Sequence, residues 1–206
     1  MANSNIQVLR RIADTVYKIV SFFFWGSIIF FVLFIGNTIW ASFLPQDSFT
    51  AESGIRHWLI QLDNDSYWHI SVLVPFTNIS PIDLSRFSVK SAFLTYSITS
   101  NLTLFPALLY GIYLVKRILE NTIDGHSPFT HGNVNNMKQL AYVLIAYSLF
   151  SELIINIFVW IFVTQIFKLS LANIHLFGAG IGAVILIISY IFQHGVYLQE
   201  EHDTTL

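Results

Sequence analysis

The chain alternates between long apolar runs and shorter polar segments. Four of the runs are long enough to cross a hydrocarbon core as helices, which takes about 20 mostly apolar residues each. They occupy residues 16–44, 91–115, 140–167 and 174–198. We therefore predict an all-α membrane protein with four transmembrane helices, folded as a single domain over residues 1–206. The first run is too long for a secretory signal peptide, so we expect it to remain as an anchor.

The segment between the first two runs, residues 45–90, shows the alternation of β-strands. Apolar side chains share one face of each of two candidate strands: Trp58, Ile60 and Leu62 in the first, and Trp68, Ile70, Val72 and Val74 in the second. Residues 63–66, Asp-Asn-Asp-Ser, favour a turn between them because their side chains bond their own backbone. We predict a small extracytoplasmic β-hairpin in this first loop.

Two features of this hairpin bear on function. Trp58 and Trp68 are expected either to anchor at the headgroup level or to face a ligand, such as an extracellular peptide. The Asp-x-Asp start of the turn lacks the glycine and distal glutamate of a calcium loop, so we interpret it as a plain turn.

Composition narrows the function classes. Hydrophobic residues make up 54% of the chain and charged residues 11%, against about 25% charged in an average soluble domain. The net charge of −2 argues against direct nucleic-acid binding, which needs a concentrated basic face. With no cysteine, disulfides and thiolate metal sites are excluded. The histidines lack ligand spacing; His175 and His194, for example, lie too far apart on one helix. We predict no metal site and no cofactor.

Lysine and arginine are biased toward one side of the membrane. If the N-terminus is cytoplasmic, the inner segments hold Arg10, Arg11, Lys18, Lys116, Arg117 and Lys138, and the outer segments hold Arg56, Arg86, Lys90 and Lys168. Positive residues favour the cytoplasmic side. We therefore expect a multi-pass protein of the bacterial cytoplasmic membrane with both termini in the cytoplasm.

Glu152 is the one acidic residue near the middle of a long apolar run. An ionisable group there is costly to insert and marks a functional site or a buried polar contact. Asn156 lies one helical turn away on the same face. The second run is unusually polar and contains Asn101 ahead of Pro106. Its polar side chains are expected to bond across helices or to backbone carbonyls freed near the proline. The alternative is that they line a polar cavity in which Asn101 meets Glu152.

The fourth run carries closely spaced glycines. Gly178 and Gly182 form a small-x-x-x-small pattern, which lets two helices approach closely. We expect packing within the chain's own bundle, with a homodimer through these glycines as the alternative.

Two short segments on the expected cytoplasmic side carry recognisable motifs. The first has the form G-x-x-P-F-x-x-x-N, with Gly125, Pro128, Phe129 and Asn133, and Thr130 or Asn133 is expected to cap the helix that follows. The second has the form G-x-x-L-x-x-E-x-D-T, with Gly195, Leu198, Glu201, Asp203 and Thr204. Acidic residues at the C-terminal end of a helix oppose its macrodipole.

On these two motifs the chain resembles the bacterial membrane family catalogued as domain of unknown function 2975. The resemblance implies a similar length, four spans and no established biochemical activity. It also implies a cytoplasmic partner, because members are often encoded beside a small helix-turn-helix regulator. The turn and the acidic tail together suit the docking of a basic DNA-binding protein.

Three hypotheses remain. The first is a non-enzymatic membrane sensor that receives a signal at the outer loop and docks the regulator inside. The second is a peptide-toxin (bacteriocin) immunity or receptor protein, because an aromatic outer loop suits peptide contact. The third is a small transporter. The sequence shows no inverted pair of broken helices, which argues against it. No nucleophile and base are spaced for catalysis, so we do not expect an enzyme.

Overall fold

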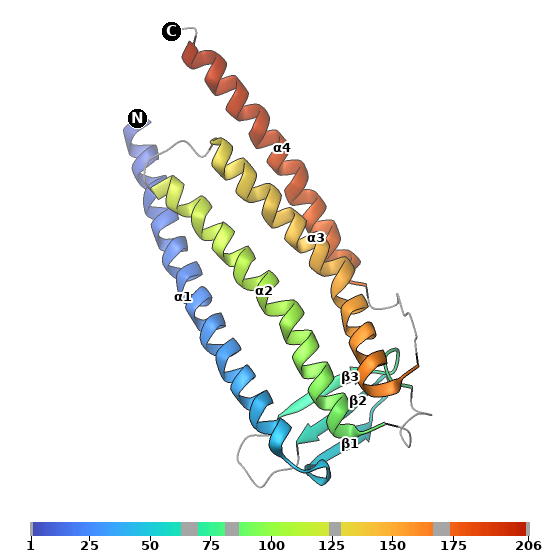
Figure 1. Ribbon diagram of the computed structural model, residues 1–206. Coiled ribbons are helices and arrows are strands. Elements are labelled where there is room, and N and C mark those ends of the chain that lie inside the picture. The colour runs from blue at the N-terminus through green and yellow to red at the C-terminus, as the bar shows by residue number, and fades with distance from the viewer. Residues whose placement is uncertain (1, 63–69, 81–86, 124–128, 167–173, 205–206) are drawn as a thin grey trace. The chain divides into compact units, whose positions relative to one another are not determined.

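The computed structural model describes residues 2–62, 70–80, 87–123, 129–166 and 174–204. Along the chain, helix α1 (Ala2–Phe43) is followed by strands β1 (Phe49–Ser53), β2 (His57–Leu62) and β3 (Ser71–Pro75), and then by helices α2 (Val89–Ile123), α3 (His131–Val159) and α4 (Leu176–Thr204) (Figure 1). Within the described part, four helices are long and apolar enough to cross a membrane. The predicted fold class is confirmed, and each helix extends beyond its apolar run.

The three strands form one antiparallel sheet in the order β1-β2-β3. The predicted hairpin is confirmed as the β2–β3 pair, in which Trp58 lies opposite Val74 and Ile60 opposite Val72. Strand β1 was not predicted, because its sequence Phe-Thr-Ala-Glu-Ser contains only two apolar side chains and gives a weak alternating pattern. The predicted turn and Trp68 lie outside the described residues.

The chain divides into two compact units. Unit 1 contains residues 1–29, 105–148 and 175–206, and unit 2 contains residues 30–104 and 149–174. Unit 1 is built from parts of α1, α2 and α3 and from all of α4, and unit 2 holds the sheet with other parts of α1, α2 and α3.

The core of unit 2 lies under one face of the sheet. Its buried residues come from β1 to β3, from the segment after β3 and from the three helices: Ala41, Phe49, Trp58, Ile60, Leu62, Val74, Ile79, Ala92, Phe93, Ile155, Val159 and Val163. A two-stranded ribbon is barely stable alone in water. Here a third strand and the burial of one face against helices stabilise the sheet. Lys90 of α2 also donates to the carbonyls of Ser42 and Leu44, at 2.8 and 2.6 Å, and so satisfies acceptors left open at the end of α1.

Helix α3 ends in an irregular turn. Residues Trp160–Thr164 continue it as a π-helical turn. Gln165 then adopts a left-handed conformation, with φ 53°, and its N–H donates to the carbonyl of Trp160 at 2.8 Å. This contact closes the last turn of the helix, in the manner of a left-handed C-terminal cap.

Helices α3 and α4 pack closely within unit 1. A Cβ atom on Gly178 would meet the Oγ of Ser148, and one on Gly182 would lie 2.7 Å from Ile145 Cγ1 and 3.0 Å from the carbonyl of Ala141. These two glycines therefore face α3 of the same chain. The predicted packing within the chain's own bundle is confirmed for Gly178 and Gly182. The alternative homodimer stays a prediction.

Candidate functional site

A buried polar cluster surrounds Glu152 in unit 2. Glu152 is 5% exposed and lies on α3, one turn before the buried Asn156. The Asn78 amide donates to Glu152 Oε1 at 3.1 Å and to Asn156 Oδ1 at 3.1 Å. Asn78 in turn accepts a bond from the hydroxyl of Thr77 at 3.0 Å. One amide from the segment after β3 thus bridges two polar side chains on α3.

The partner of Glu152 differs from the one predicted. Asn101 was expected to meet Glu152, but its amide donates to the carbonyl of Ser97 on its own helix at 2.9 Å. An asparagine inside a helix can satisfy its side chain on the preceding turn without reaching a neighbour. Asn78 escaped the sequence analysis because it lies in a short turn without periodicity. The signal that was present is the pair Thr77 and Asn78 between the apolar residues Phe76 and Ile79.

The other polar side chains of α2 also bond their own helix. Hydroxyls of Thr99, Ser100 and Thr103 donate to the carbonyls of Thr95, Tyr96 and Thr99, at 2.6, 2.6 and 3.0 Å. These bonds lie within about three turns before Pro106, which lacks an N–H to donate. For these three hydroxyls the bonds go to backbone carbonyls ahead of Pro106, which was one of the two predicted options, and not across helices. The cavity shared by Asn101 and Glu152 stays a prediction.

Trp58 holds the segment that presents Asn78. Its side chain is 3% exposed, and its indole N–H donates to the carbonyl of Ile79 at 3.0 Å. Trp58 is therefore a core residue, and neither the interfacial anchor nor the ligand contact that we predicted. Burial of the ring on the apolar face of β2 explains this, because the indole nitrogen finds a backbone acceptor there. The sheet, Asn78 and Glu152 form one connected structure within unit 2.

The two sequence motifs meet in unit 1. The ring of Phe129 lies against Gly195 of α4, where an added Cβ would come within 2.8 Å of Phe129 Cδ1. The same ring packs on Phe192 with a centroid distance of 5.0 Å. The glycine of the second motif is thus needed to admit the phenylalanine of the first.

The start of α3 is fixed beside this contact. The N–H of Asn133 donates to Thr130 Oγ1 at 3.2 Å, which confirms Thr130 as the N-terminal cap. The side chain of Asn133 is 1% exposed, and its Oδ1 accepts from the Asn121 amide of α2 at 2.7 Å. The first motif therefore joins α2, α3 and α4. Its Gly125 and Pro128 lie outside the described residues.

Acidic side chains stand at the end of α4 next to this junction. Glu200 Oε1 lies 2.9 Å from His131 Nε2, and both side chains are exposed. Glu201 is exposed as well, and Thr204 bonds the carbonyl of Glu201 on its own helix at 2.9 Å. The side chain of Asp203 lies outside the described part.

No group of three or more histidine, cysteine, aspartate or glutamate side chains stands close enough to hold a metal ion in the part of the chain that the structure describes. The Glu152 cluster contains one carboxylate and two amides, which are joined by hydrogen bonds.

Comparison with known proteins identifies a family without an assigned role. The model of a family described as "Protein of unknown function (DUF2975)" matches residues 70–206. This range covers β3, all of α2 to α4 and both motifs. Neither a curated protein nor a solved structure matches the chain.

Proposed function

Since the chain belongs to the DUF2975 family, whose description assigns no function, we propose its role from its own geometry. We propose a non-enzymatic regulatory protein of the bacterial cytoplasmic membrane that docks a basic helix-turn-helix regulator at the cytoplasmic end of α4. The loop sheet on the other side of the membrane receives the signal, and α3 connects the two.

The observation that carries the proposal is the meeting of the two motifs. Phe129 and Gly195 are 66 positions apart in the sequence, yet the structure puts the ring against the glycine. His131 and Glu200 form a second contact between the same segments. The surface is assembled from the start of α3 and the C-terminal part of α4. Such a surface is suited to binding a partner whose docking depends on how the two helices pack.

The charge of this surface favours a basic partner. Glu200 and Glu201 stand in the last turns of α4, where the helix macrodipole disfavours negative charge. A DNA-binding protein offers the complementary positive charge, and complementary charge speeds association and selects the partner. Docking there would offset the unfavourable position of the two carboxylates.

The Glu152 cluster supports a link to the loop. Asn78 belongs to the segment that Trp58 of the sheet holds, and its amide bonds two side chains of α3. The same helix begins at the first motif, with Asn133 in its first turn. A ligand that displaced the sheet would therefore act on α3, whose first residue, His131, contacts Glu200 of the docking surface on α4.

A co-purification experiment tests the docking. A small helix-turn-helix regulator of the kind that the resemblance implies is expressed with the wild-type protein and with the double variant Glu201→Gln, Asp203→Asn. We expect the variant to retain about tenfold less regulator, because charges at an interface rim contribute to capture. The retained amount should fall further as salt is raised.

The matched control is Glu52→Gln, which removes one carboxylate from β1 in the loop sheet. It should retain the regulator at the wild-type level. Absence of the regulator from the wild-type preparation would overturn the docking proposal, and equal retention by the double variant would show that these carboxylates do not bind it.

The exposed face of the sheet supports the alternative of peptide-toxin immunity. Ile55, in the turn between β1 and β2, is 93% exposed, and Leu73 of β3 is 55% exposed. Exposed apolar side chains of this kind suit contact with a hydrophobic peptide. If a deletion strain becomes sensitive to secreted antimicrobial peptides and Ile55→Ser fails to restore resistance, this alternative replaces the sensor.

A further inference from the structure

An apolar groove runs between three helices of unit 1. Its volume is about 540 Å³. The lining is contributed mainly by Val20 and Phe23 of α1, Leu108 and Val115 of α2, and Leu140 and Leu144 of α3. The α1 part of the lining runs from Val20 to Ser27, which corresponds to about 10 Å of helix rise. This length accommodates part of one acyl chain.

A lysine stands at one end of the groove. Lys116 directly follows the groove residue Val115, and its Nζ lies 5.2 Å from the centroid of the Tyr17 ring and 5.0 Å from that of Phe24. Cation–π contacts of this kind hold an ammonium group in place without neutralising it. Tyr17 is itself fixed, because its hydroxyl donates to Glu120 at 2.9 Å.

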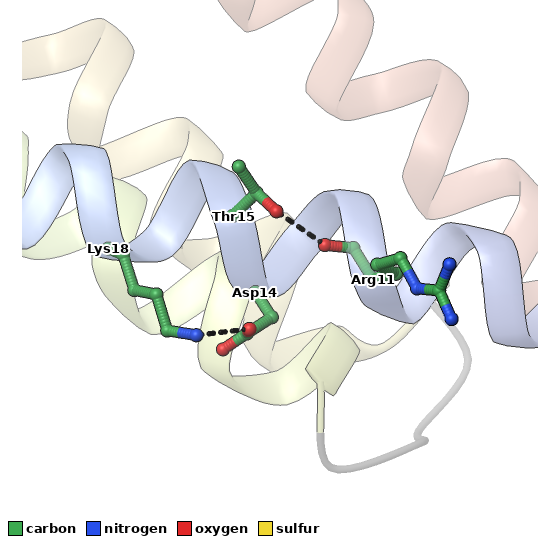
Figure 2. A network of polar contacts seen from close by, with 4 residues as sticks. All are labelled: Arg11, Asp14, Thr15 and Lys18. Carbon is green, nitrogen blue, oxygen red and sulfur yellow. Dashed lines mark hydrogen bonds and ion pairs between the residues drawn. The ribbon is translucent and has the colours of Figure 1, made fainter.

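The groove end with Lys116 is positively charged overall. Within unit 1, this end of α1 and α2 contains five basic side chains and two acidic ones: Arg10, Arg11, Lys18, Lys116 and Arg117 against Asp14 and Glu120. Asp14 is already paired with Lys18 at 2.7 Å, and the guanidinium of Arg11 lies away from that pair (Figure 2). Three positive charges therefore remain after the two acidic side chains are subtracted from the five basic ones.

From this combination we propose that the groove binds an anionic phospholipid, with an acyl chain along the apolar lining and the phosphate at Lys116. An apolar groove open to the bilayer, ending in fixed positive charge, is complementary to a molecule with an acyl chain and a negative headgroup. Basic pockets between transmembrane helices bind such headgroups. The site is separate from the docking surface at Phe129 and Glu201, and it needs no cytoplasmic regulator.

Native mass spectrometry of the detergent-solubilised full chain tests the site. The protein is titrated with phosphatidylglycerol and, separately, with phosphatidylcholine. We expect a first phosphatidylglycerol to bind more tightly than phosphatidylcholine. Lys116→Gln should weaken phosphatidylglycerol about fivefold, the effect of one basic residue near an anionic headgroup, and should leave phosphatidylcholine unchanged. Lys116→Arg should bind as the wild type does.

Two further variants separate the groove from general surface charge. Lys138→Gln removes a cation of the same unit that lies over the ring of Tyr190 and bonds Gln193, away from the groove lining. It should bind phosphatidylglycerol like the wild type. Ala107→Phe fills the groove from α2 and should weaken both lipids.

Four results would overturn the proposal. The first is equal binding of the two lipids by the wild type. The second is a loss with Lys138→Gln as large as that with Lys116→Gln. The third is unchanged binding by Ala107→Phe, and the fourth is a second copy of the chain retained in place of lipid. None of these readouts involves the regulator, so the lipid site and the docking proposal fail independently.

Discussion

At the scale of single residues, Asn78 is the side chain on which the Glu152 cluster depends. Both hydrogens of its amide are used, one toward Glu152 and one toward Asn156. Replacing asparagine by leucine keeps a similar size but removes both donors. We expect Asn78→Leu to destabilise unit 2 by about 1–3 kcal/mol, the usual cost of leaving buried polar groups with fewer partners.

Thermal unfolding in detergent, followed by tryptophan fluorescence, measures this effect because Trp58 belongs to the same core. Asn101→Leu is the matched control, since Asn101 bonds only its own helix turn, to Ser97 and Ser100. Its loss should be about 0.5 kcal/mol or less. Glu152→Gln retains an acceptor oxygen and should fall between the two. Equal losses for Asn78→Leu and Asn101→Leu would refute the bridging role of Asn78.

The residue scale also shows where sequence analysis succeeds and where it stops. A carboxylate inside an apolar run can be predicted to be buried in protein, because exposing it to lipid is costly. Its partner cannot be deduced in the same way, since any amide brought close by the fold can serve. Asn101 was the more conspicuous asparagine, yet the helix satisfied it locally, and the turn after β3 supplied Asn78 instead.

At the scale of elements, the periodic segments were predictable and the weakly patterned ones were not. The apolar runs predicted four helices, and Trp58, Ile60 and Leu62 predicted the buried face of β2. Strand β1 depends on pairing with β2, where Phe49 lies opposite Leu62 and Ala51 opposite Ile60. Strand β2 supplies the hydrogen bonds and the shared core that stabilise β1, and neither can be predicted from the sequence of β1 alone.

The packing of α4 on α3 gives a prediction with a control on the same helix. A Cβ on Gly182 would meet Ile145 and the backbone carbonyl of Ala141, and a backbone group cannot rotate away. Gly182→Ala should therefore separate the helices locally and destabilise unit 1 by about 1–3 kcal/mol. A Cβ added to Gly180 would meet no atom within 4 Å.

Gly180→Ala should leave stability unchanged or raise it by up to about 1 kcal/mol, because alanine favours helix more than glycine does. Both variants are compared by thermal unfolding of the detergent-solubilised protein. The packing interpretation predicts a loss of stability for Gly182→Ala and no loss for Gly180→Ala. If Gly182→Ala proved as stable as Gly180→Ala, α4 would not pack on α3 through Gly182.

At the scale of the whole molecule, the two motifs are explained by one junction. Phe129, Gly195 and Asn133 are separated in sequence and are brought together by the ends of α2, α3 and α4. The two motifs can be recognised in the sequence, which predicts that they lie on one side of the membrane. Only the folded structure shows the contact between them. The remaining expectation at this scale is the direction in which the chain crosses the membrane.

Four crossings would put the loop between α1 and α2 on the side opposite to the C-terminus, and the lysine and arginine bias predicts that the C-terminus is cytoplasmic. The chain has no cysteine, so single-cysteine variants give an unambiguous label. Ile55, in the turn between β1 and β2, is 93% exposed, and Thr204 is exposed at the end of α4. The two variants are therefore Ile55→Cys and Thr204→Cys. With a membrane-impermeant maleimide, intact cells should label Ile55→Cys only, and lysed cells should label both. Labelling of Thr204→Cys alone in intact cells would reverse the orientation and move the acidic docking surface outside, whereas labelling of both would rule out four crossings.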